Sequence, residues 1–177
     1  MERTPVIETQ RLRLRGHRAA DFADVYAMWS DPAVTRYIGH PSTESQAWMR
    51  LLSYVGAWEL LGYGSWVVEE RATGRFAGEI GFADFKRDIE AVMRGVPEAG
   101  WAFAAHAHGK GYASEALAAA CAWRDGALAA ERTVCIIDPQ NIASIKVAEK
   151  AGFRAIGDGR FNEKTVRFFE RFRPPSD

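Results

Sequence analysis

The chain has 177 residues, 47 % of them hydrophobic, and its 23 Lys and Arg side chains are balanced by 23 Asp and Glu side chains. This size and apolar content predict a single domain, residues 1–177, around one core. Because the formal net charge is zero, the chain has no general field for nucleic acid or for an anionic membrane surface. Any anion must therefore be bound locally.

No segment reaches the roughly 20 apolar residues that cross a bilayer. The start, Met1–Arg15, also lacks the apolar core of a signal peptide, which predicts a cytoplasmic protein. Cys121 and Cys135 have no CxxC partner, so two buried thiols are expected. The four His residues are scattered and form no HExxH motif, so no metal is expected.

Strand and helix patterns alternate in the first part of the chain. Leucines alternate with arginines over Gln10–Arg15, which predicts a strand with one exposed face. Asp21 is expected to cap the helix that follows it. Thr43 and Gln46 have the spacing of a capping box, which predicts a second helix that ends at Gly62–Gly64.

The remainder of the chain is richer in strand patterns, although the charged stretch Lys86–Pro97 looks like an exposed connection. The predicted strands and helices are Ser65–Glu70, Phe76–Phe82, Glu98–Phe103, Tyr112–Leu128, Thr133–Asp138, Ala143–Lys150, Phe153–Gly157 and Thr165–Arg171. The first three are antiparallel strands. The strand, helix and strand between 98 and 138 form one right-handed βαβ unit, so its two strands should be parallel. The predicted fold class is α+β, with a mixed, mostly antiparallel sheet flanked by helices.

A glycine-rich segment joins the first strand and the helix of this unit. Within Ala104–Glu115, Gly109, Gly111 and Ala113 stand at alternate positions, where minimal side chains let backbone N–H groups approach an anion. The following helix adds unpaired donors and the positive end of its dipole. A plain strand-to-helix turn is the alternative. A dinucleotide fold requires further βαβ units, and a P-loop requires Ser or Thr where this chain has Gly111, so both nucleotide interpretations are weaker.

A second informative segment opens the last helix. The run NIASIKVAEKAGF, residues 141–153, comes soon after the strand ending at Asp138. Together with HGKGYA, residues 108–113, it resembles the GCN5-related N-acetyltransferases (GNAT), specifically the RimJ/RimL-type branch that modifies ribosomal-protein N-termini. The resemblance extends over nearly the whole chain, beginning with ETQRL at residues 8–12.

The resemblance implies the GNAT fold and acetyl-CoA as co-substrate. The two parallel strands would splay apart to admit the pantetheine arm, and the backbone amides of the glycine loop would bind the pyrophosphate. His108 stands at the first loop position, where the family usually has Gln or Arg. The implied cofactor-binding residues are Phe103, His108, Gly109, Lys110, Gly111, Tyr112, Ala113, Ser114, Asn141, Ser144 and Lys150.

Two proton transfers need candidate residues. Many family members carry a tyrosine general acid at the position that is Ala148 here, which leaves Ser144 or a bound water to protonate the departing thiolate. A CoA thiol is itself fairly acidic, near the ~8.5 of a cysteine thiol, so strong acid catalysis is not required. A protonated amine must also lose a proton. Glu98, whose strand leads to the glycine loop, is the favoured base, and Glu79 on the preceding strand is the alternative.

These features together predict direct acetyl transfer from acetyl-CoA to a primary amine, such as a protein N-terminus, a polyamine, an antibiotic amine or an amino acid. Neither Cys residue is a convincing covalent nucleophile. The enzyme would act as a monomer or homodimer without nucleic-acid or membrane partners. A non-catalytic acyl-CoA-binding or regulatory module is the second hypothesis, because the usual tyrosine is absent at Ala148.

Overall fold

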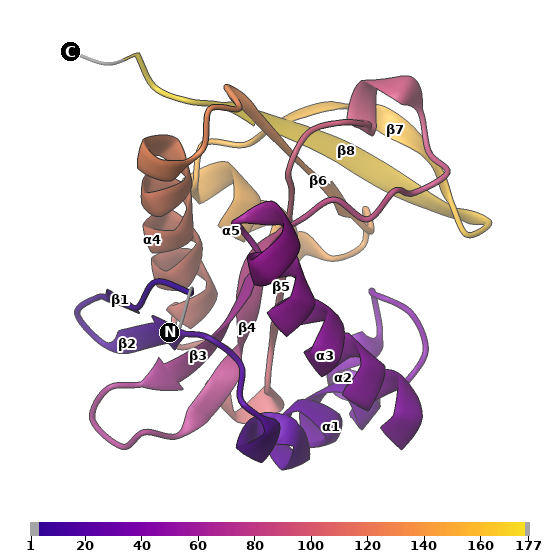
Figure 1. Ribbon diagram of the computed structural model, residues 1–177. Helices are drawn as coiled ribbons and strands as arrows, with labels where there is room; N and C mark the ends of the chain where they lie inside the picture. The colour runs from indigo at the N-terminus through magenta and orange to yellow at the C-terminus, as the bar shows by residue number, and fades with distance from the viewer. Residues whose placement is uncertain (1–3, 176–177) are drawn as a thin grey trace.

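The computed structural model describes residues 4–175, and an eight-stranded sheet organises them in the order β1-β2-β3-β4-β5-β6-β8-β7 (Figure 1). The strands are β1 (Ile7–Glu8), β2 (Leu12–Arg15), β3 (Ser65–Glu70), β4 (Phe76–Ala83), β5 (Glu98–Phe103), β6 (Arg132–Ile137), β7 (Arg154–Phe161) and β8 (Lys164–Phe172). Neighbouring strands are antiparallel except for β5 and β6, which are parallel. The predicted α+β fold with a mixed, mostly antiparallel sheet is confirmed.

Helices cover both faces of the sheet (Figure 1). They are α1 (Phe22–Ser30), α2 (Pro32–Thr35), α3 (Glu44–Leu61), α4 (Tyr112–Ala127) and α5 (Ile142–Lys150). Val25 of α1 and Leu51 of α3 share a core cluster with Val67 of β3. Leu117 of α4 packs with Val68, the next residue of that strand. Because successive strand residues point to opposite faces, α1 and α3 cover one face and α4 the other.

The helix caps predicted from the sequence are confirmed for α3 but not for α1. The Thr43 hydroxyl accepts a 3.3 Å bond from Gln46 N–H, and the Gln46 side chain accepts a 2.9 Å bond from Thr43 N–H, so the capping box of α3 is confirmed. The left-handed Gly62, at φ +72°, ends that helix. Asp21 stands at the N-cap of α1, but its side chain makes no capping bond there. Its carboxylate binds Arg15 and the Arg18 N–H instead, because a guanidinium is a stronger partner.

The parallel pair is joined at one register position only. Glu98 lies opposite Val134, and Val134 N–H donates to the Pro97 carbonyl at 3.1 Å. Beyond that point β6 pairs with β8, and β5 continues to Phe103 with no further β6 partner. The two strands therefore splay apart, as expected.

Two segments differ from the sequence-based expectation. The last two strands form a longer hairpin, whose two-residue turn places Asn162 and Glu163 at φ +47° and +64°. A turn of this kind usually contains glycine, so its sequence gives a weak signal. The stretch Lys86–Pro97 is not simply exposed. Ile89 and Met93 are about 5 % exposed and pack against β6 and β8, which anchors the connection.

Cys121 and Cys135 are free and buried, as predicted. Burial raises the pKa of Cys121 to about 11, so its thiol stays protonated at neutral pH. Burial likewise raises the pKa of Cys135. Within residues 4–175, no helix is both long and apolar enough to cross a membrane.

Candidate active site

The glycine loop lies between β5 and α4. Gly109 and Gly111 have φ values of +73° and +78°, a left-handed conformation that strains residues with a Cβ. A Cβ at Gly109 would meet no atom within 4 Å, so backbone conformation rather than space requires the glycine. Gly111 is the N-cap of α4 and supplies no side-chain cap. The first N–H groups of α4 are therefore left for an anion, which suits the pyrophosphate of acetyl-CoA.

The β1–β2 turn braces this loop from outside. Arg11 Nη1 donates to the Lys110 carbonyl at 2.8 Å, and Arg11 Nε binds Glu115 Oε2 at 2.7 Å. Thr9 donates from its hydroxyl to the other Glu115 oxygen at 2.6 Å. Glu115 lies in the first turn of α4. The ETQRL segment thus fixes both the loop and the helix start.

Side chains of the loop point to protein partners. The Lys110 ammonium lies 3.1 Å from Glu70 Oε1, and the Tyr112 hydroxyl donates to the same oxygen at 3.2 Å. The hydrogen bond from Lys110, with help from Thr73, lowers the pKa of Glu70. His108 Nε2 lies 2.7 Å from the Phe103 carbonyl and closes the loop onto the end of β5. The backbone N–H groups of this loop are therefore the donors that its side chains leave for an anion.

Other predicted cofactor residues occupy three places. Phe103 is 6 % exposed and belongs to the core, so only its backbone is available. Ala113 and Ser114 are half-buried in the first turn of α4. Lys150 is exposed at the C-terminal end of α5, opposite to the end that begins at Asn141. Their contacts with a cofactor stay predictions.

A cavity of about 520 Å³ opens where β5 and β6 separate. It reaches the adjacent residues Ile136 and Ile137 of β6, which point to opposite faces of the sheet. Gly81 and Gly100 lie opposite each other on β4 and β5 and form the floor of the cavity. Because they have no side chains, the space above them stays open. The remaining walls come from α1, α3 and the loop before it, the start of β3, the 84–97 segment, the start of α5 and the β7–β8 hairpin. The cavity therefore extends through the gap between the splayed strands.

The first turn of α5 brings two predicted residues to this cavity. Asn141 Oδ1 accepts the Ser144 N–H at 3.1 Å and caps the helix. This cap does not use the Asn141 amide nitrogen. Both side chains line the cavity. Ala148, one turn further along, is fully buried in the main core cluster, so the position of the usual tyrosine is filled by packing here.

Glu98 also lines the cavity, but an arginine holds it. Arg87 Nε lies 2.9 and 3.1 Å from the two carboxylate oxygens. The Arg87 guanidinium is stacked between Phe85 and Phe161, at 4.2 and 4.5 Å from the ring centres. Burial raises the pKa of Glu98, and the Arg87 hydrogen bond and charge oppose that rise. Arg87 thus connects Glu98 to Phe161, at the end of β7.

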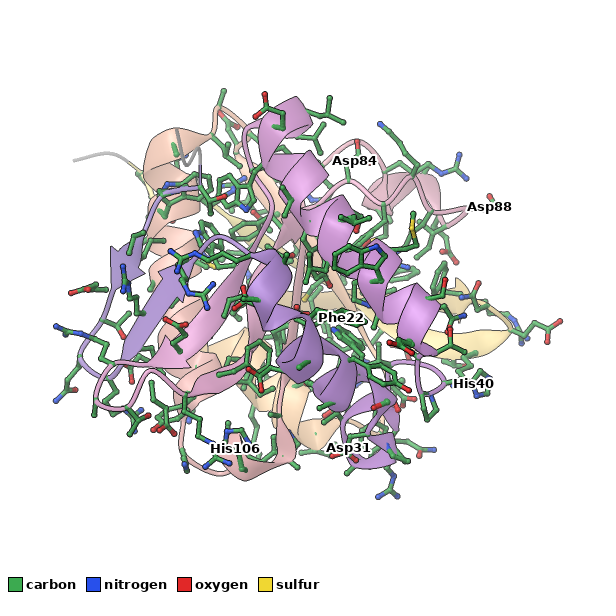
Figure 2. All side chains as sticks on the ribbon, turned by 60° about the horizontal axis from the view of Figure 1, so that its bottom comes forward. Phe22, Asp31, His40, Asp84, Asp88 and His106 are labelled. Carbon is green, nitrogen blue, oxygen red and sulfur yellow. The ribbon has the colours of Figure 1, made fainter. Side chains whose placement is uncertain are left out.

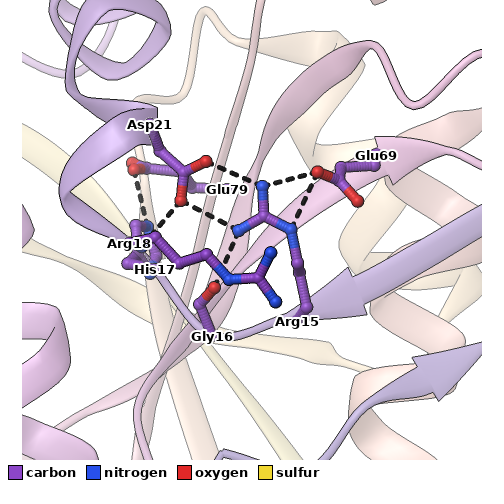
Figure 3. A network of polar contacts seen from close by, with 7 residues as sticks. All are labelled: Arg15, Gly16, His17, Arg18, Asp21, Glu69 and Glu79. Atoms are coloured by element: carbon purple, nitrogen blue, oxygen red, sulfur yellow. Dashed lines mark hydrogen bonds and ion pairs between the residues drawn. The ribbon is translucent and has the colours of Figure 1, made fainter.

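Glu79 is the second buried carboxylate of the cavity wall, and its side chain is 3 % exposed. His17 Nε2 lies 2.8 Å from Oε1, and Trp29 Nε1 donates to Oε2 at 2.7 Å. Figure 3 shows His17 and Glu79 together beside a cluster of charged side chains. The sequence patterns do not single out His17 or the polar role of Trp29.

The glycine loop is not among the residues that line the cavity. In Figure 2, His106, two residues before the glycine loop, lies at the bottom left of centre, and His40, in the cavity wall, lies at the right of the molecule. A ligand that contacts both regions must be long. Coenzyme A, with a pyrophosphate and an extended arm ending in a thiol, has that shape.

Residues 11–154 match a family model described as "Acetyltransferase (GNAT) domain". The chain belongs to the GNAT acetyltransferase family. Acetyl transfer is accordingly its general chemistry.

Curated relatives and solved structures of acetyltransferases also match this chain. The chain is 30 % identical over 158 residues to the "Uncharacterized N-acetyltransferase YoaA" of Bacillus subtilis, covering 86 % of this chain and 85 % of YoaA. A putative GNAT-family acetyltransferase from Bordetella pertussis superposes with a TM-score of 0.84 at 33 % identity, covering 94 % of this chain and 99 % of that one.

A RimL ribosomal L7/L12 α-N-protein acetyltransferase in complex with CoA shares the fold. Its TM-score is 0.77 at 17 % identity, and the match covers 95 % of this chain and 98 % of the RimL chain. The fold of this GNAT domain is therefore also that of the ribosomal-protein acetyltransferases that its sequence resembles.

Proposed function

We propose that this GNAT domain transfers an acetyl group from acetyl-CoA directly to the nitrogen of a primary amine. The observation that carries the proposal is the cavity at the splayed β5–β6 pair, which is reached from the cofactor side by Asn141 and Ser144 and from the other side by α1 and α3. Donor and acceptor can meet there in one complex, so catalysis relies on positioning. The acceptor would be a protein N-terminus or a small-molecule amine of the cytoplasm.

The donor would lie along the β5 edge. Backbone amides of residues 108–114 would hold the pyrophosphate, the Asn141 amide nitrogen would bind the arm, and Lys150 would contact the far end of the cofactor. Backbone N–H groups of β5 that lack a β6 partner would stabilise the developing oxyanion without any particular side chain.

Ser144 would deliver a proton to the departing thiolate, directly or through water. Its half-buried side chain lines the cavity, and its backbone is fixed by the Asn141 cap. Because the leaving thiol is fairly acidic, we expect Ser144→Ala to lower kcat by no more than about 100-fold, at the low end of general acid catalysis. An unchanged kcat with an unchanged pH profile would remove Ser144 from the mechanism.

The function is tested by CoA release from acetyl-CoA with a panel of N-terminal peptides, polyamines, aminoglycosides and amino acids. Acetylation of one amine class, verified by mass spectrometry, supports the proposal. CoA binding without release for any amine would favour the non-catalytic module instead.

A further inference from the structure

We propose that Glu79 is the carboxylate that accepts the proton of the acceptor ammonium, and that His17 and Trp29 are positioning residues that hold it. This inference rests on the proposed function and names the base of that same site. Glu98, the other carboxylate considered for this role, is its direct rival.

The hydrogen bonds of Glu79 leave it able to accept another proton. A carboxylate offers about four lone-pair positions on its two oxygens. His17 and Trp29 occupy one position on each oxygen, at 2.8 and 2.7 Å. The other lone-pair positions of the Glu79 carboxylate have no partner among the described hydrogen bonds, and Glu79 lines the cavity. Glu79 is thus held in place without being saturated.

His17 is itself fixed by its neighbours in the chain (Figure 3). Arg15 donates to the Gly16 carbonyl at 2.8 Å and to both oxygens of Asp21 at 2.8 and 2.7 Å. Asp21 in turn accepts the Arg18 N–H at 2.7 Å. The backbone is therefore pinned on both sides of His17. This rigidity is what a group that orients a base requires.

His17 offers no onward path for a proton. Its Nε2 faces Glu79, and its Nδ1 is buried without a hydrogen-bond partner among the described residues. The accepted proton must therefore return through the cavity side of the carboxylate. Glu79 acts alone in the transfer, and His17 serves to orient it.

Val67 and Ala102, the residues paired with Glu79 on the two flanking strands, are apolar. The other polar groups around Glu79, Tyr54 and Arg50, come from α3. Burial raises the pKa of the Tyr54 phenol, and the Glu79 charge raises it further, against the effect of Arg50. The phenol therefore stays protonated at neutral pH. The Arg50 guanidinium is stacked 3.8 Å above the Trp29 ring. His17, Tyr54 and Arg50 are thus the titratable or charged groups that face Glu79 from the segments packed against it.

The two carboxylates differ in their partners. Glu79 lies opposite Ala102 and Glu98 lies opposite Ala83, so both point to the same face of the sheet from opposite ends of the glycine-lined floor. Arg87 contacts both oxygens of Glu98 and places a permanent positive charge against them. An incoming ammonium is repelled by that charge. Glu79 has two ring N–H partners instead, and Arg50 stacks on Trp29, whereas Arg87 contacts the Glu98 carboxylate directly, which favours Glu79 as the proton acceptor.

In the acetyl transfer, the ammonium first gives one proton to Glu79. The free amine nitrogen then forms a bond to the thioester carbonyl carbon. The C–S bond breaks, the nitrogen loses its second proton, and the thiolate gains one. Glu79 finally releases its proton to solvent, so amide, free thiol and one proton are the products.

The test compares Glu79→Gln with Glu98→Gln on two acceptors. One is the best amine of the panel, which is protonated at neutral pH, and the other is methoxyamine, a weakly basic amine that is not. We expect Glu79→Gln to lower kcat/KM for the first by about 100-fold or more and for methoxyamine by much less. Raising the pH should reduce the defect, because the amine then arrives unprotonated. CoA affinity should not change.

Three outcomes would overturn the assignment. Glu79→Gln could lose activity equally with both amines while its CoA affinity and thermal unfolding stay normal, it could retain full activity with both, or Glu98→Gln could show the selective loss instead. An inactive wild type would refute the proposed function itself and is distinguished by the CoA-release panel.

Two further variants keep the test decisive if Glu79→Gln does not fold. Trp29→Phe removes one N–H donor but keeps a ring, and His17→Phe does the same for the other. Both should lower kcat for the protonated amine more than for methoxyamine, and Glu79→Asp should restore part of the rate lost in Glu79→Gln. Equal losses with the two amines would assign His17 and Trp29 to folding alone.

Discussion

Arg11 Nη1 donates a 2.8 Å hydrogen bond to the backbone carbonyl of Lys110, across 99 residues of chain. This contact fixes the middle of the glycine loop from a turn that carries no chemistry of its own. Glu115 completes the brace, because it binds both the Arg11 side chain and the Arg11 N–H. The loop is thus held in its anion-binding conformation before a cofactor arrives.

The brace predicts a selective defect in Arg11→Ala. The loop would lose a charged hydrogen bond and its packing on Tyr112, so we expect CoA affinity to fall by about 5- to 20-fold, equivalent to about 1–2 kcal/mol for a hydrogen bond to a charged group. The value of kcat at saturation should change little. Isothermal titration with CoA measures this, and Arg13→Ala, an exposed neighbour on β2, is the control. Equal effects of the two variants would contradict the brace.

Lys110→Ala tests whether the phosphates are held by the backbone. The Lys110 ammonium is already paired with Glu70, at 43 % side-chain exposure, and exposed pairs contribute little. We expect a CoA affinity within about 3-fold of wild type, corresponding to less than 1 kcal/mol. A tenfold or larger loss that disappears at high salt would show that Lys110 leaves Glu70 and binds the phosphates.

Two glycine substitutions should separate the two halves of the site. Gly109→Ala places a Cβ on a left-handed residue, so it should strain the loop by about 1–2 kcal/mol and weaken CoA binding. Gly100→Ala has open space and no left-handed φ, so the protein should fold normally with a raised KM for the acceptor alone. Steady-state kinetics with both substrates varied distinguish these effects. Interchanged results would show that the cavity and the loop have been assigned to the wrong substrates.

Asp21→Asn tests the cluster that holds His17. Burial raises the pKa of Asp21, but hydrogen bonds from Arg15 and from the Arg18 N–H outweigh it, so the net pKa is lowered. A lowered carboxylate pKa stabilises the fold above the unfolded value of about 3.9, and this stability is lost as the pH falls through the folded value. At pH 7 we expect Asp21→Asn to destabilise by about 3–5 kcal/mol, because Arg15 loses a buried partner.

Urea unfolding across acidic pH measures that stability. The difference between wild type and Asp21→Asn should shrink as the pH falls below about 3.9, where Asp21 becomes protonated in the unfolded chain, and on through its lowered folded-state pKa. Asp24→Asn, on an exposed residue of α1, is the control and should stay close to wild type. A difference that is constant with pH would show that the Asp21 charge does not stabilise the fold.

Much of the framework could be predicted from local patterns. The capping box of α3, the strand Glu98–Phe103 and the parallel orientation of β5 and β6 follow from short spacings along the chain, whereas the separation of that strand pair is expected only from the family resemblance. The glycine loop could be predicted as well. Gly109 and Gly111 have positive φ values that favour glycine, and the glycines themselves are visible in the sequence.

The contacts that make the site specific could not be predicted in the same way. His17 and Glu79 are 62 residues apart, and the Arg11 brace spans still more of the chain. Each residue looks ordinary by itself: His17 follows a strand, and Trp29 fits the apolar stripe of α1. The antiparallel register of β2, β3 and β4 brings His17 to Glu79, and the position of α1 on the sheet brings Trp29 there. The anchoring of the 84–97 segment by Ile89 and Met93 likewise depends on distant strands.

The central claim is direct transfer within one complex of donor and acceptor, and the initial-rate pattern tests it most directly. CoA release should be measured with acetyl-CoA and the accepted amine varied together, and the acetylated product should be counted by mass spectrometry. Direct transfer predicts intersecting double-reciprocal lines and one acetylated amine for each CoA released. Parallel lines with an acetylated enzyme, or CoA release without acetylated amine, would contradict it.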